Sequence, residues 1–231
     1  MKNTLLKAAL FIFFSLAAAA WAGPGPGVPP PPQAGSEAFA KDESFYELGL
    51  TLRKTPRGEL AAADASLDKL PALSKALSSI VGFKISKGET PATWKLLKRA
   101  RKEVRQKTRA AKEFYQRPRP FIAHKGDPTC LPPYKKILLR SRQSYPSGHA
   151  SSAYAMALAF SLAYPAKAGD ILALGARVGE SRWICGVHWE SDVGAGQTLA
   201  RAEISRLQED PSFQALVDAA RKELAKKGSP A

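Results

Sequence analysis

The sequence predicts an all-α protein built as a compact single-domain helical bundle. After residue 36, apolar residues recur at the three- and four-residue spacing of amphipathic helices along most of the chain. No stretch alternates apolar and polar residues convincingly as a strand would, and no internal repeat is evident. The length of 231 residues suits one domain with a full hydrophobic core.

The first 22 residues have the layout of a secretory signal peptide. Lys2 and Lys7 give a positive start, and the apolar run over 8–20 is too short to span a bilayer. Ala20-Trp21-Ala22 is a small-x-small cleavage site. We therefore expect export to the periplasm, with loss of residues 1–22 and no membrane anchor afterwards; an uncleaved anchor helix is the alternative.

Residues 23–36 are rich in glycine and proline, which predicts a flexible linker before a domain over 37–231. Prolines and glycines then punctuate the apolar pattern of the domain. The periodic segments between them predict helices over 37–53, 60–80, 92–115, 150–163, 168–183, 188–207 and 213–226.

The helix over 92–115 has the longest periodic pattern, and Lys112 borders its apolar stripe, so this lysine should lean toward the interior. Most other basic residues of the helix should lie on its solvated face, namely Lys95, Lys98, Lys102, Arg105 and Arg109. The helix should stop at Arg117-Pro118-Arg119-Pro120, because proline disfavours helical backbone in the residue before it. Arg119 should therefore extend from a rigid corner, with Arg117 as the competing cation.

Pro146-Ser147-Gly148-His149 should open the helix over 150–163. A helix N-terminus offers free backbone N–H groups and the positive end of a dipole, the geometry that holds phosphate. Taken alone this motif is weak evidence, because a serine that caps an ordinary helix explains it as well.

His188 and Asp192 lie four residues apart and should share one face of the helix that continues to residue 207. A carboxylate at that spacing can fix the tautomer of the histidine, although a surface ion pair has the same pattern. Arg182 should approach the same pocket, because Gly186 breaks the helix between Arg182 and His188.

The chain has two cysteines, Cys130 and Cys185. In an exported protein they are expected to form one disulfide rather than to stay as two buried thiols. The bond would tie the loop between Pro120 and Pro146 to the residues just before His188.

The three motifs together resemble those of the class A bacterial non-specific acid phosphatases, within the type 2 phosphatidic acid phosphatase and vanadium haloperoxidase superfamily. The pattern of that superfamily is Lys-x6-Arg-Pro, then Pro-Ser-Gly-His, then Ser-Arg-x5-His-x3-Asp. Every fixed position is filled here: Lys112, Arg119, Pro120, Pro146, Ser147, Gly148, His149, Ser181, Arg182, His188 and Asp192. The resemblance implies the helical fold of these enzymes and hydrolysis of small phosphate monoesters.

The resemblance also implies roles for these residues. His188 would become the phosphohistidine, Asp192 would be its partner, and His149 would be the general acid and later the base. Lys112, Arg119, Arg182, Ser147 and Gly148 would bind the phosphoryl group. Arg117 should then contribute little, and His124, outside every motif, should be solvated or structural.

No Walker A loop, zinc-spaced cysteine and histidine cluster or paired-aspartate motif occurs, so no metal or other cofactor is implied. The net charge of +15 favours anionic ligands without requiring nucleic acid. Three alternatives share some of these features: a lipid phosphate or isoprenyl pyrophosphate phosphatase, a vanadium-dependent haloperoxidase, and a non-catalytic cationic protein that binds polyanions. The family often forms dimers, so a homodimer is possible.

Overall fold

The structure is a computed structural model that describes residues 27–132, 137, 139 and 143–228. Within these residues every regular element is a helix, which confirms the predicted fold class. The α-helices are α1 (Glu37–Leu52), α2 (Pro56–Ala63), α3 (Leu70–Val81), α4 (Pro91–Tyr115), α5 (Pro120–Ala123), α7 (Gly148–Ala163), α8 (Ala168–Ile184), α9 (Glu190–Gln208) and α10 (Pro211–Gly228), with short 3-10 turns η1 (Asp64–Ser66) and η2 (Pro165–Lys167). The predicted signal peptide lies outside the described residues.

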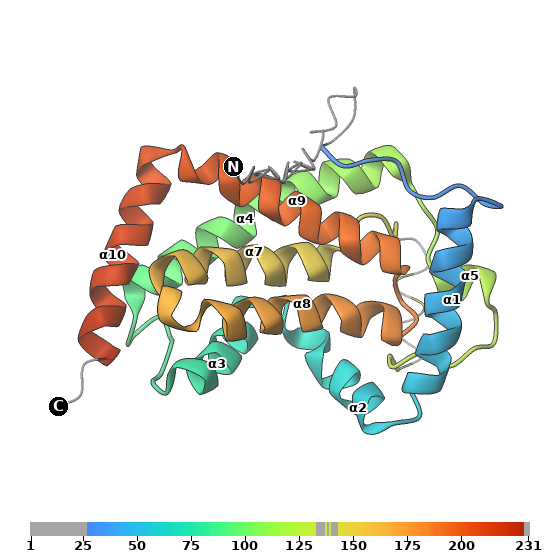
Figure 1. Ribbon diagram of the computed structural model, residues 1–231, viewed down its shortest axis with the longest axis horizontal. Coiled ribbons are helices and arrows are strands. Elements are labelled where there is room, and N and C mark those ends of the chain that lie inside the picture. Colours follow the sequence, from blue (N-terminus) through green and yellow to red (C-terminus); the bar gives the residue numbers. More distant parts are fainter. Residues whose placement is uncertain (1–26, 133–136, 138, 140–142, 229–231) are drawn as a thin grey trace, which may run out of the picture.

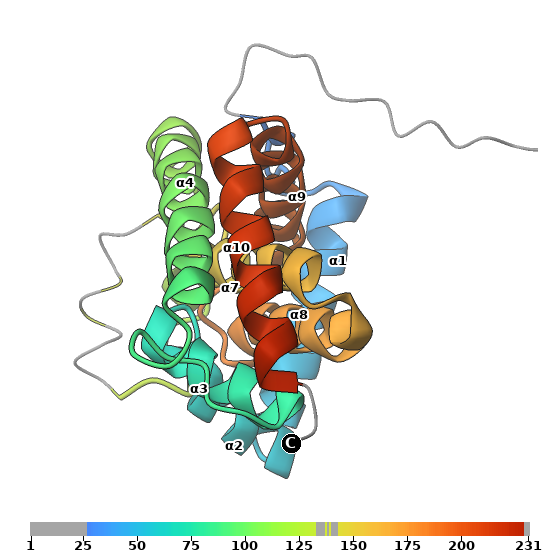
Figure 2. The same ribbon diagram turned by 90° about the vertical axis from the view of Figure 1, so that its left-hand side faces the viewer.

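Helix α7 forms the centre of the bundle, and its main neighbours are α8, α4 and α9 (Figure 1). Its sequence is dominated by alanine, and apolar or small side chains are buried around nearly its whole circumference. A helix that is apolar on all sides is stable only inside a protein. Helix α10 crosses the end of this group, as the two perpendicular views show (Figures 1 and 2).

Two glycines allow the central helices to approach closely. A Cβ atom on Gly175 of α8 would lie 2.8 Å from the Cβ of Ala157 on α7, and one on Gly196 of α9 would lie 2.7 Å from the carbonyl oxygen of Ser147. Such contacts are too short for any side chain at these positions. Gly175 thus lets α8 approach α7, and Gly196 brings α9 against the start of α7.

Helix α4 buries the apolar stripe that its sequence predicts, from Leu97 through Val104 to Ala111. It ends at Gln116, which has a left-handed backbone with φ 48°, and the two Arg-Pro pairs follow. Proline at positions 118 and 120 prevents the helix from continuing. The last turn of α4 therefore places Lys112 beside the corner that carries Arg119.

The predicted helix over 60–80 is wrong as a single element. The structure divides this region into α2, η1 and α3, and α2 begins already at Pro56. Pro71 stands in the first turn of α3, where its missing N–H costs nothing, but it could not occupy the interior of one continuous helix. The break positions Asp68 between η1 and α3.

The expectation of a flexible linker is wrong at Val28 and Pro29. The side chain of Val28 is fully buried, and the hydroxyl of Tyr115 donates to its carbonyl oxygen at 2.6 Å. The hydroxyl of Tyr145 donates to the carbonyl oxygen of Pro29, also at 2.6 Å. We call residues 28–29 the N-terminal strap. Proline and glycine composition predicted its lack of helix, but not its attachment to the domain.

Cys130 and Cys185 form a disulfide, as predicted. The bond ties the loop after α5 to the C-terminal end of α8, and the N–H of Cys130 also donates to the carbonyl oxygen of Cys185 at 3.4 Å. None of the described helices combines the length and apolar character that a membrane span requires.

Candidate active site

Residues from all three motifs meet at one pocket of ≈ 380 Å³. It lies between the second half of α4, the first turn of α7 and the segment that precedes α9. Its lining consists of Asp68, Arg105, Thr108, Arg109, Lys112, Glu113, Arg119, Leu139, Gln143, Gly148, His149 and His188. The volume leaves room for a phosphoryl group together with part of its alcohol.

His188 is almost fully buried, and both ring nitrogens have partners. Its Nδ1 lies 3.2 Å from Oδ2 of Asp192 and 3.3 Å from Oγ of Ser144, while its Nε2 lies 3.0 Å from Nη1 of Arg119. Since the carboxylate accepts a proton from Nδ1 and the guanidinium is itself a donor, Nε2 carries the lone pair. This is the tautomer that a nucleophilic histidine needs.

Asp192, which shows no solvent-exposed surface, is held by several donors. Its Oδ2 accepts from the N–H of Trp189 at 2.9 Å and from the hydroxyl of Ser144, and its Oδ1 accepts from Nη1 of Arg117 at 2.8 Å. Three donors fix the carboxylate from three directions. Asp192 can therefore orient the ring of His188 without moving itself.

Arg117 is the main residue that the sequence analysis misjudged. It is buried, and besides Asp192 it binds Oδ2 of Asp42 at 2.6 Å and the hydroxyl of Ser191 at 2.7 Å. Asp42 in turn accepts from the N–H of Ser191 at 2.8 Å. Removal of Arg117 would leave two buried carboxylates without their cation, so the expectation that it contributes little is not supported by this geometry.

Lys112 and Arg119 lie on the side of the pocket that contains His188. The Nζ of Lys112 donates to the carbonyl oxygens of Gln143 and Ser144 at 2.7 and 2.8 Å, and Arg119 donates to the carbonyl oxygen of Val187 at 2.5 Å. Burial, and then the adjacent Arg119, lower the pKa of Lys112 to about 7. A bound anion would counter both effects.

Arg182 is buried, yet its Nε and Nη1 have no hydrogen-bond partner among the described residues. Burial lowers its pKa to about 10. The preceding residue is firmly held, because the hydroxyl of Ser181 donates to Oδ2 of Asp64 at 2.7 Å. A buried guanidinium with empty donors is costly, and an oxyanion is the ligand that would satisfy it.

His149 stands in the first turn of α7, and its side chain is 29% exposed. Its Nε2 lies 3.4 Å from Oδ1 of Asp68. Burial lowers the pKa of His149 well below its usual value, and the charges of Arg182, His188 and Arg119 lower it further. A bound phosphoryl dianion would counter the effect of these cations and raise the proton affinity of His149.

Known proteins match most of the chain. The profile of the PAP2 superfamily matches residues 104–204, which include all three motifs. The chain is 40% identical over 195 residues to the non-specific acid phosphatase of Providencia stuartii, covering 84% of this chain and 77% of that protein. It is 37% identical over 193 residues to the non-specific acid phosphatase of Salmonella typhi, covering 83% and 76%. The chain belongs to the PAP2 superfamily.

A third relative is the acid phosphatase of Zymomonas mobilis, which is 34% identical over 193 residues that cover 84% of this chain and 72% of that protein. The chain is thus similar to acid phosphatases over most of its length, in line with the resemblance that the motifs indicated.

Three predicted site residues, Ser147, Arg182 and Asp192, are not among the residues that line the pocket. The hydroxyl of Ser147 caps α7 by accepting from the N–H of Ala150 at 3.4 Å, and its buried side chain is not part of the lining. Gly148 does line the pocket, 3.9 Å from Cε of Lys112 when a Cβ is placed on it. Serine therefore forms the cap that its sequence position allows, and the adjacent glycine faces the site.

Residues outside the motifs also reach the PAP2 site. Arg105 and Arg109 are solvent-exposed, as expected for that face of α4, but both line the pocket. Ser144, Asp42 and Asp68 were not predicted at all, because no local spacing connects them to the motifs. His124 stacks on the ring of Tyr46 with centroids 4.1 Å apart, outside the pocket lining, which is the structural role expected for it.

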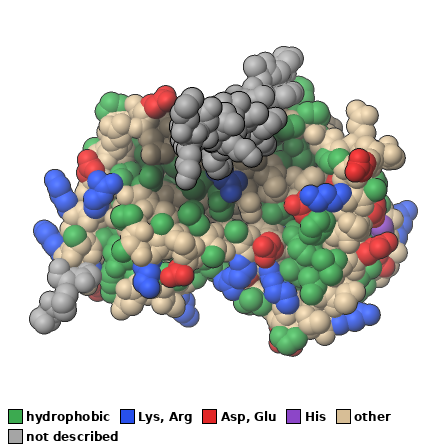
Figure 3. Space-filling view, viewed as in Figure 1, with side chains coloured by type: hydrophobic (Ala, Val, Ile, Leu, Met, Phe, Trp, Pro, Cys, Tyr) green, Lys and Arg blue, Asp and Glu red, His purple; other side chains and the backbone are tan. Residues whose placement is uncertain are grey.

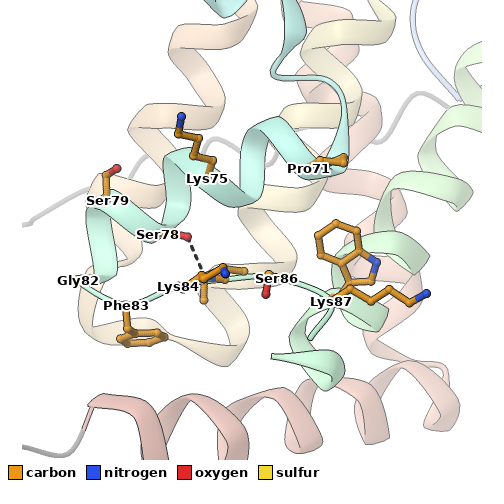
Figure 4. A pocket seen from close by; sticks show the side chains of 11 residues that line it. Pro71, Lys75, Ser78, Ser79, Gly82, Phe83, Lys84, Ser86 and Lys87 are labelled. Atoms are coloured by element: carbon orange, nitrogen blue, oxygen red, sulfur yellow. Dashed lines mark hydrogen bonds between the residues drawn. The ribbon is translucent and has the colours of Figure 1, made fainter. Parts of the chain in front are cut away.

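A larger hollow of ≈ 680 Å³ lies between α3 and the start of α4 (Figure 4). Its lining contains Lys75, Lys84, Lys87, Phe83 and Trp94, but no histidine or carboxylate. Its serines therefore have no histidine or carboxylate in the lining that could act as their base. Among the residues that the structure describes, no group of three or more histidine, cysteine or acidic side chains could hold a metal ion.

The basic surface does not form a continuous patch on the face that Figure 3 shows. Lysine and arginine side chains are scattered there among acidic and apolar ones. A protein that tracks a nucleic-acid backbone gathers its cations along one stripe. On this face the positive charge of the chain has no such arrangement.

Proposed function

We propose that this protein is a non-specific acid phosphatase that hydrolyses phosphate monoesters through a phosphohistidine formed on Nε2 of His188. The observation that carries the proposal is the buried His188, whose Nδ1 faces Asp192 while Nε2 lies in a pocket lined by cations. The similarity to acid phosphatases over more than four-fifths of the chain supports it.

In the first half of the reaction, the lone pair of His188 Nε2 attacks phosphorus and the bond from phosphorus to the ester oxygen breaks. His149 donates its proton to the departing alcohol. Arg119, Arg182 and Lys112 stabilise the negative charge that spreads over the equatorial oxygens. Asp192 stabilises the positive charge that develops on the imidazole of His188.

In the second half, a water molecule attacks phosphorus and gives a proton to His149. The bond from phosphorus to Nε2 breaks, and its electron pair returns to His188. Inorganic phosphate leaves, and both histidines regain their starting protonation states.

An acidic working range follows from the charges of the site. His149 must be protonated in the substrate complex, and the lysine at position 112, with a pKa of about 7, gains its full charge below neutrality. His188 must stay neutral, and burial together with Arg119 lowers its pKa well below the usual value. These requirements overlap on the acid side of pH 7.

The test combines three measurements on the purified protein. Hydrolysis of p-nitrophenyl phosphate should persist in EDTA, vanadate should compete with substrate and bind more tightly than phosphate, and acid-labile phosphohistidine should be trapped by rapid denaturation. Loss of activity in EDTA with recovery on added divalent metal would overturn the metal-independent mechanism. Hydrolysis without a trapped intermediate, together with inversion of configuration at a chiral phosphorus, would overturn the phosphohistidine.

Export and assembly belong to the same proposal. The basic and apolar start of the sequence supports cleavage of residues 1–22 and release into the periplasm. Cell fractionation and mass determination of the mature chain test this directly. A homodimer stays a prediction from the family, and sedimentation of the purified protein checks it.

A further inference from the structure

A carboxylate outside the three motifs lies against the proposed general acid. Asp68, between η1 and α3, lines the pocket and places Oδ1 3.4 Å from Nε2 of His149. We propose that Asp68 is a positioning residue, which holds the ring of His149 and keeps a proton on it for the leaving alcohol. This inference rests on the acid role proposed above for His149.

The carboxylate of Asp68 is itself held in place by α4. Arg101 donates from Nε to the carbonyl oxygen of Asp68 at 2.7 Å, and Nη1 of Arg105 lies 3.7 Å from Oδ2. The two carboxylate oxygens thus have different neighbours, with Oδ2 toward α4 and Oδ1 toward α7. The side chain is only 11% exposed, so water screens these interactions weakly.

The ring of His149 has contacts to one short segment of chain. A backbone hydrogen bond to Ala65 raises its proton affinity, and Asp68 follows three residues later. Both groups thus come from the segment 65–68, which packs against the first turn of α7 at this ring.

The charges around His149 explain why a carboxylate is needed. Arg182, His188 and Arg119 face the ring, and all three oppose its protonation. The groups that face Asp68 are the cations Lys69, Arg101, Arg105 and Arg182. Asp68 is the one negative charge in contact with the ring among the described residues, so it partly offsets the cations that bind the phosphoryl group.

The variant Asp68→Asn removes the charge and keeps the size of the side chain. Loss of a negative charge lowers the pKa of His149, so the alkaline limb of the pH profile of kcat/KM should move to lower pH by roughly one unit. Alkyl phosphates, whose leaving groups need a proton, should lose about tenfold in kcat/KM near pH 6. The activity on p-nitrophenyl phosphate should change much less.

Two further variants control for a merely structural effect. Asp68→Glu keeps the charge and should retain the ratio of activities on the two esters. Glu113→Gln removes one negative charge from the same pocket lining on α4, and it should leave that ratio unchanged. A thermal melt of each variant reports its fold, and Asp68→Ser replaces Asp68→Asn if the latter is unfolded at the assay temperature.

A double-mutant cycle with His149→Ala separates this inference from the proposed function. If Asp68 acts through His149, Asp68→Asn should add no further loss on alkyl phosphates in the His149→Ala background. An additive loss there, with His149→Ala itself selective for alkyl phosphates, would overturn the positioning role alone. Equal losses on both esters in His149→Ala would instead remove His149 from the acid role.

Discussion

The two histidines of the pocket are held in contrasting ways. His188 is buried, both of its nitrogens have partners, and its carboxylate Asp192 accepts from three further groups. His149 is partly exposed, one carboxylate lies 3.4 Å away, and the nearby Arg182 has two donor nitrogens without partners in the described structure. His188 is thus held by protein partners on both nitrogens, whereas the cation near His149 has donors that a bound anion would satisfy.

The difference indicates how each side of the pocket would lower the activation free energy. Groups that are fixed before substrate arrives need no reorganisation during the reaction, and this applies to His188 and Asp192. The Nε and Nη1 donors of Arg182 are instead buried without a hydrogen-bond partner among the described residues, and a bound phosphoryl group would supply one. Binding energy from the phosphoryl group then relieves that cost, so affinity for the anion and assembly of the site are coupled.

The largest effect should come from His188→Ala, because His149, the other imidazole of the described lining, is assigned to the leaving alcohol and lacks the paired carboxylate that orients His188. We expect loss of turnover on every ester, measured with p-nitrophenyl phosphate, and no trapped phosphohistidine. The circular dichroism spectrum should stay helical, since the helices around the site keep their packing. Activity close to wild type would show that the nucleophile lies elsewhere.

Arg182→Ala and Arg119→Ala should separate the two sides of the pocket. Each should lower kcat/KM by about 10² to 10³, the range for one lost oxyanion donor. Their effects on stability should differ, because Arg119 donates to the carbonyl oxygens of Val187 and Gln143, whereas Nε and Nη1 of Arg182 lack partners. Thermal melts should therefore show a clear loss for Arg119→Ala and little or none for Arg182→Ala. Equal destabilisation would contradict the asymmetry.

Arg117→Ala tests the network behind the nucleophile. The substitution leaves Asp42 and Asp192 buried without their cation, which should cost about 3–5 kcal/mol of unfolding free energy. Urea denaturation measures this loss, with Arg221→Ala as a control, because Arg221 pairs with Asp218 on the surface. A loss for Arg117→Ala no larger than for the control would contradict a stabilising role for this network.

A smaller effect should appear in the pH dependence of stability. The pKa values of Lys112, His149 and His188 are all lowered in the folded protein, so between their folded and unfolded values the unfolded chain binds more protons. Stability from the two histidines is therefore fully present above about pH 6.5 and falls as the pH drops below that value. For Lys112 the same fall runs from about pH 10 down to pH 7.

A dianion in the pocket should oppose this fall, because it raises the same three pKa values. Sulfate keeps its charge over this pH range, so it should raise the melting temperature more at pH 5 than at pH 8. Arg182→Ala at the same sulfate concentration controls for general salt effects on folding. An equal shift at both pH values in the wild type would mean that anion binding and protonation are independent.

The sequence predicted the parts of the site that depend on local spacing. His188 and Asp192 lie four residues apart around the start of a helix, and the prolines beyond α4 place Arg119, so short-range geometry was sufficient. Arg117 and Asp42 are 75 residues apart, and no local pattern connects them. Asp68 reaches His149 because the chain is interrupted between η1 and α3. The apolar pattern favours one continuous helix in this region.

The dependence on long-range contacts also explains the remaining errors in the predicted fold. Amphipathic periodicity identified α4, α8, α9 and α10 because each buries a stripe or a face that its own sequence defines. Residues 23–36 have no hydrophobic periodicity. Their proline and glycine content indicates only that the segment does not form a helix. The segment is attached to the domain by two tyrosine hydroxyls from distant parts of the chain, which donate hydrogen bonds to the carbonyl oxygens of Val28 and Pro29.

The N-terminal strap also bears on the order of events when this chain folds. Its two hydrogen bonds join residues 87 and 116 positions apart, to Tyr115 at the end of α4 and to Tyr145 just before the turn that opens α7. Contacts of such long range have the largest loop entropy to overcome, so they form after the local helices. The strap is thus among the last segments of the domain to find its place, and it then joins the end of α4 to the segment before α7.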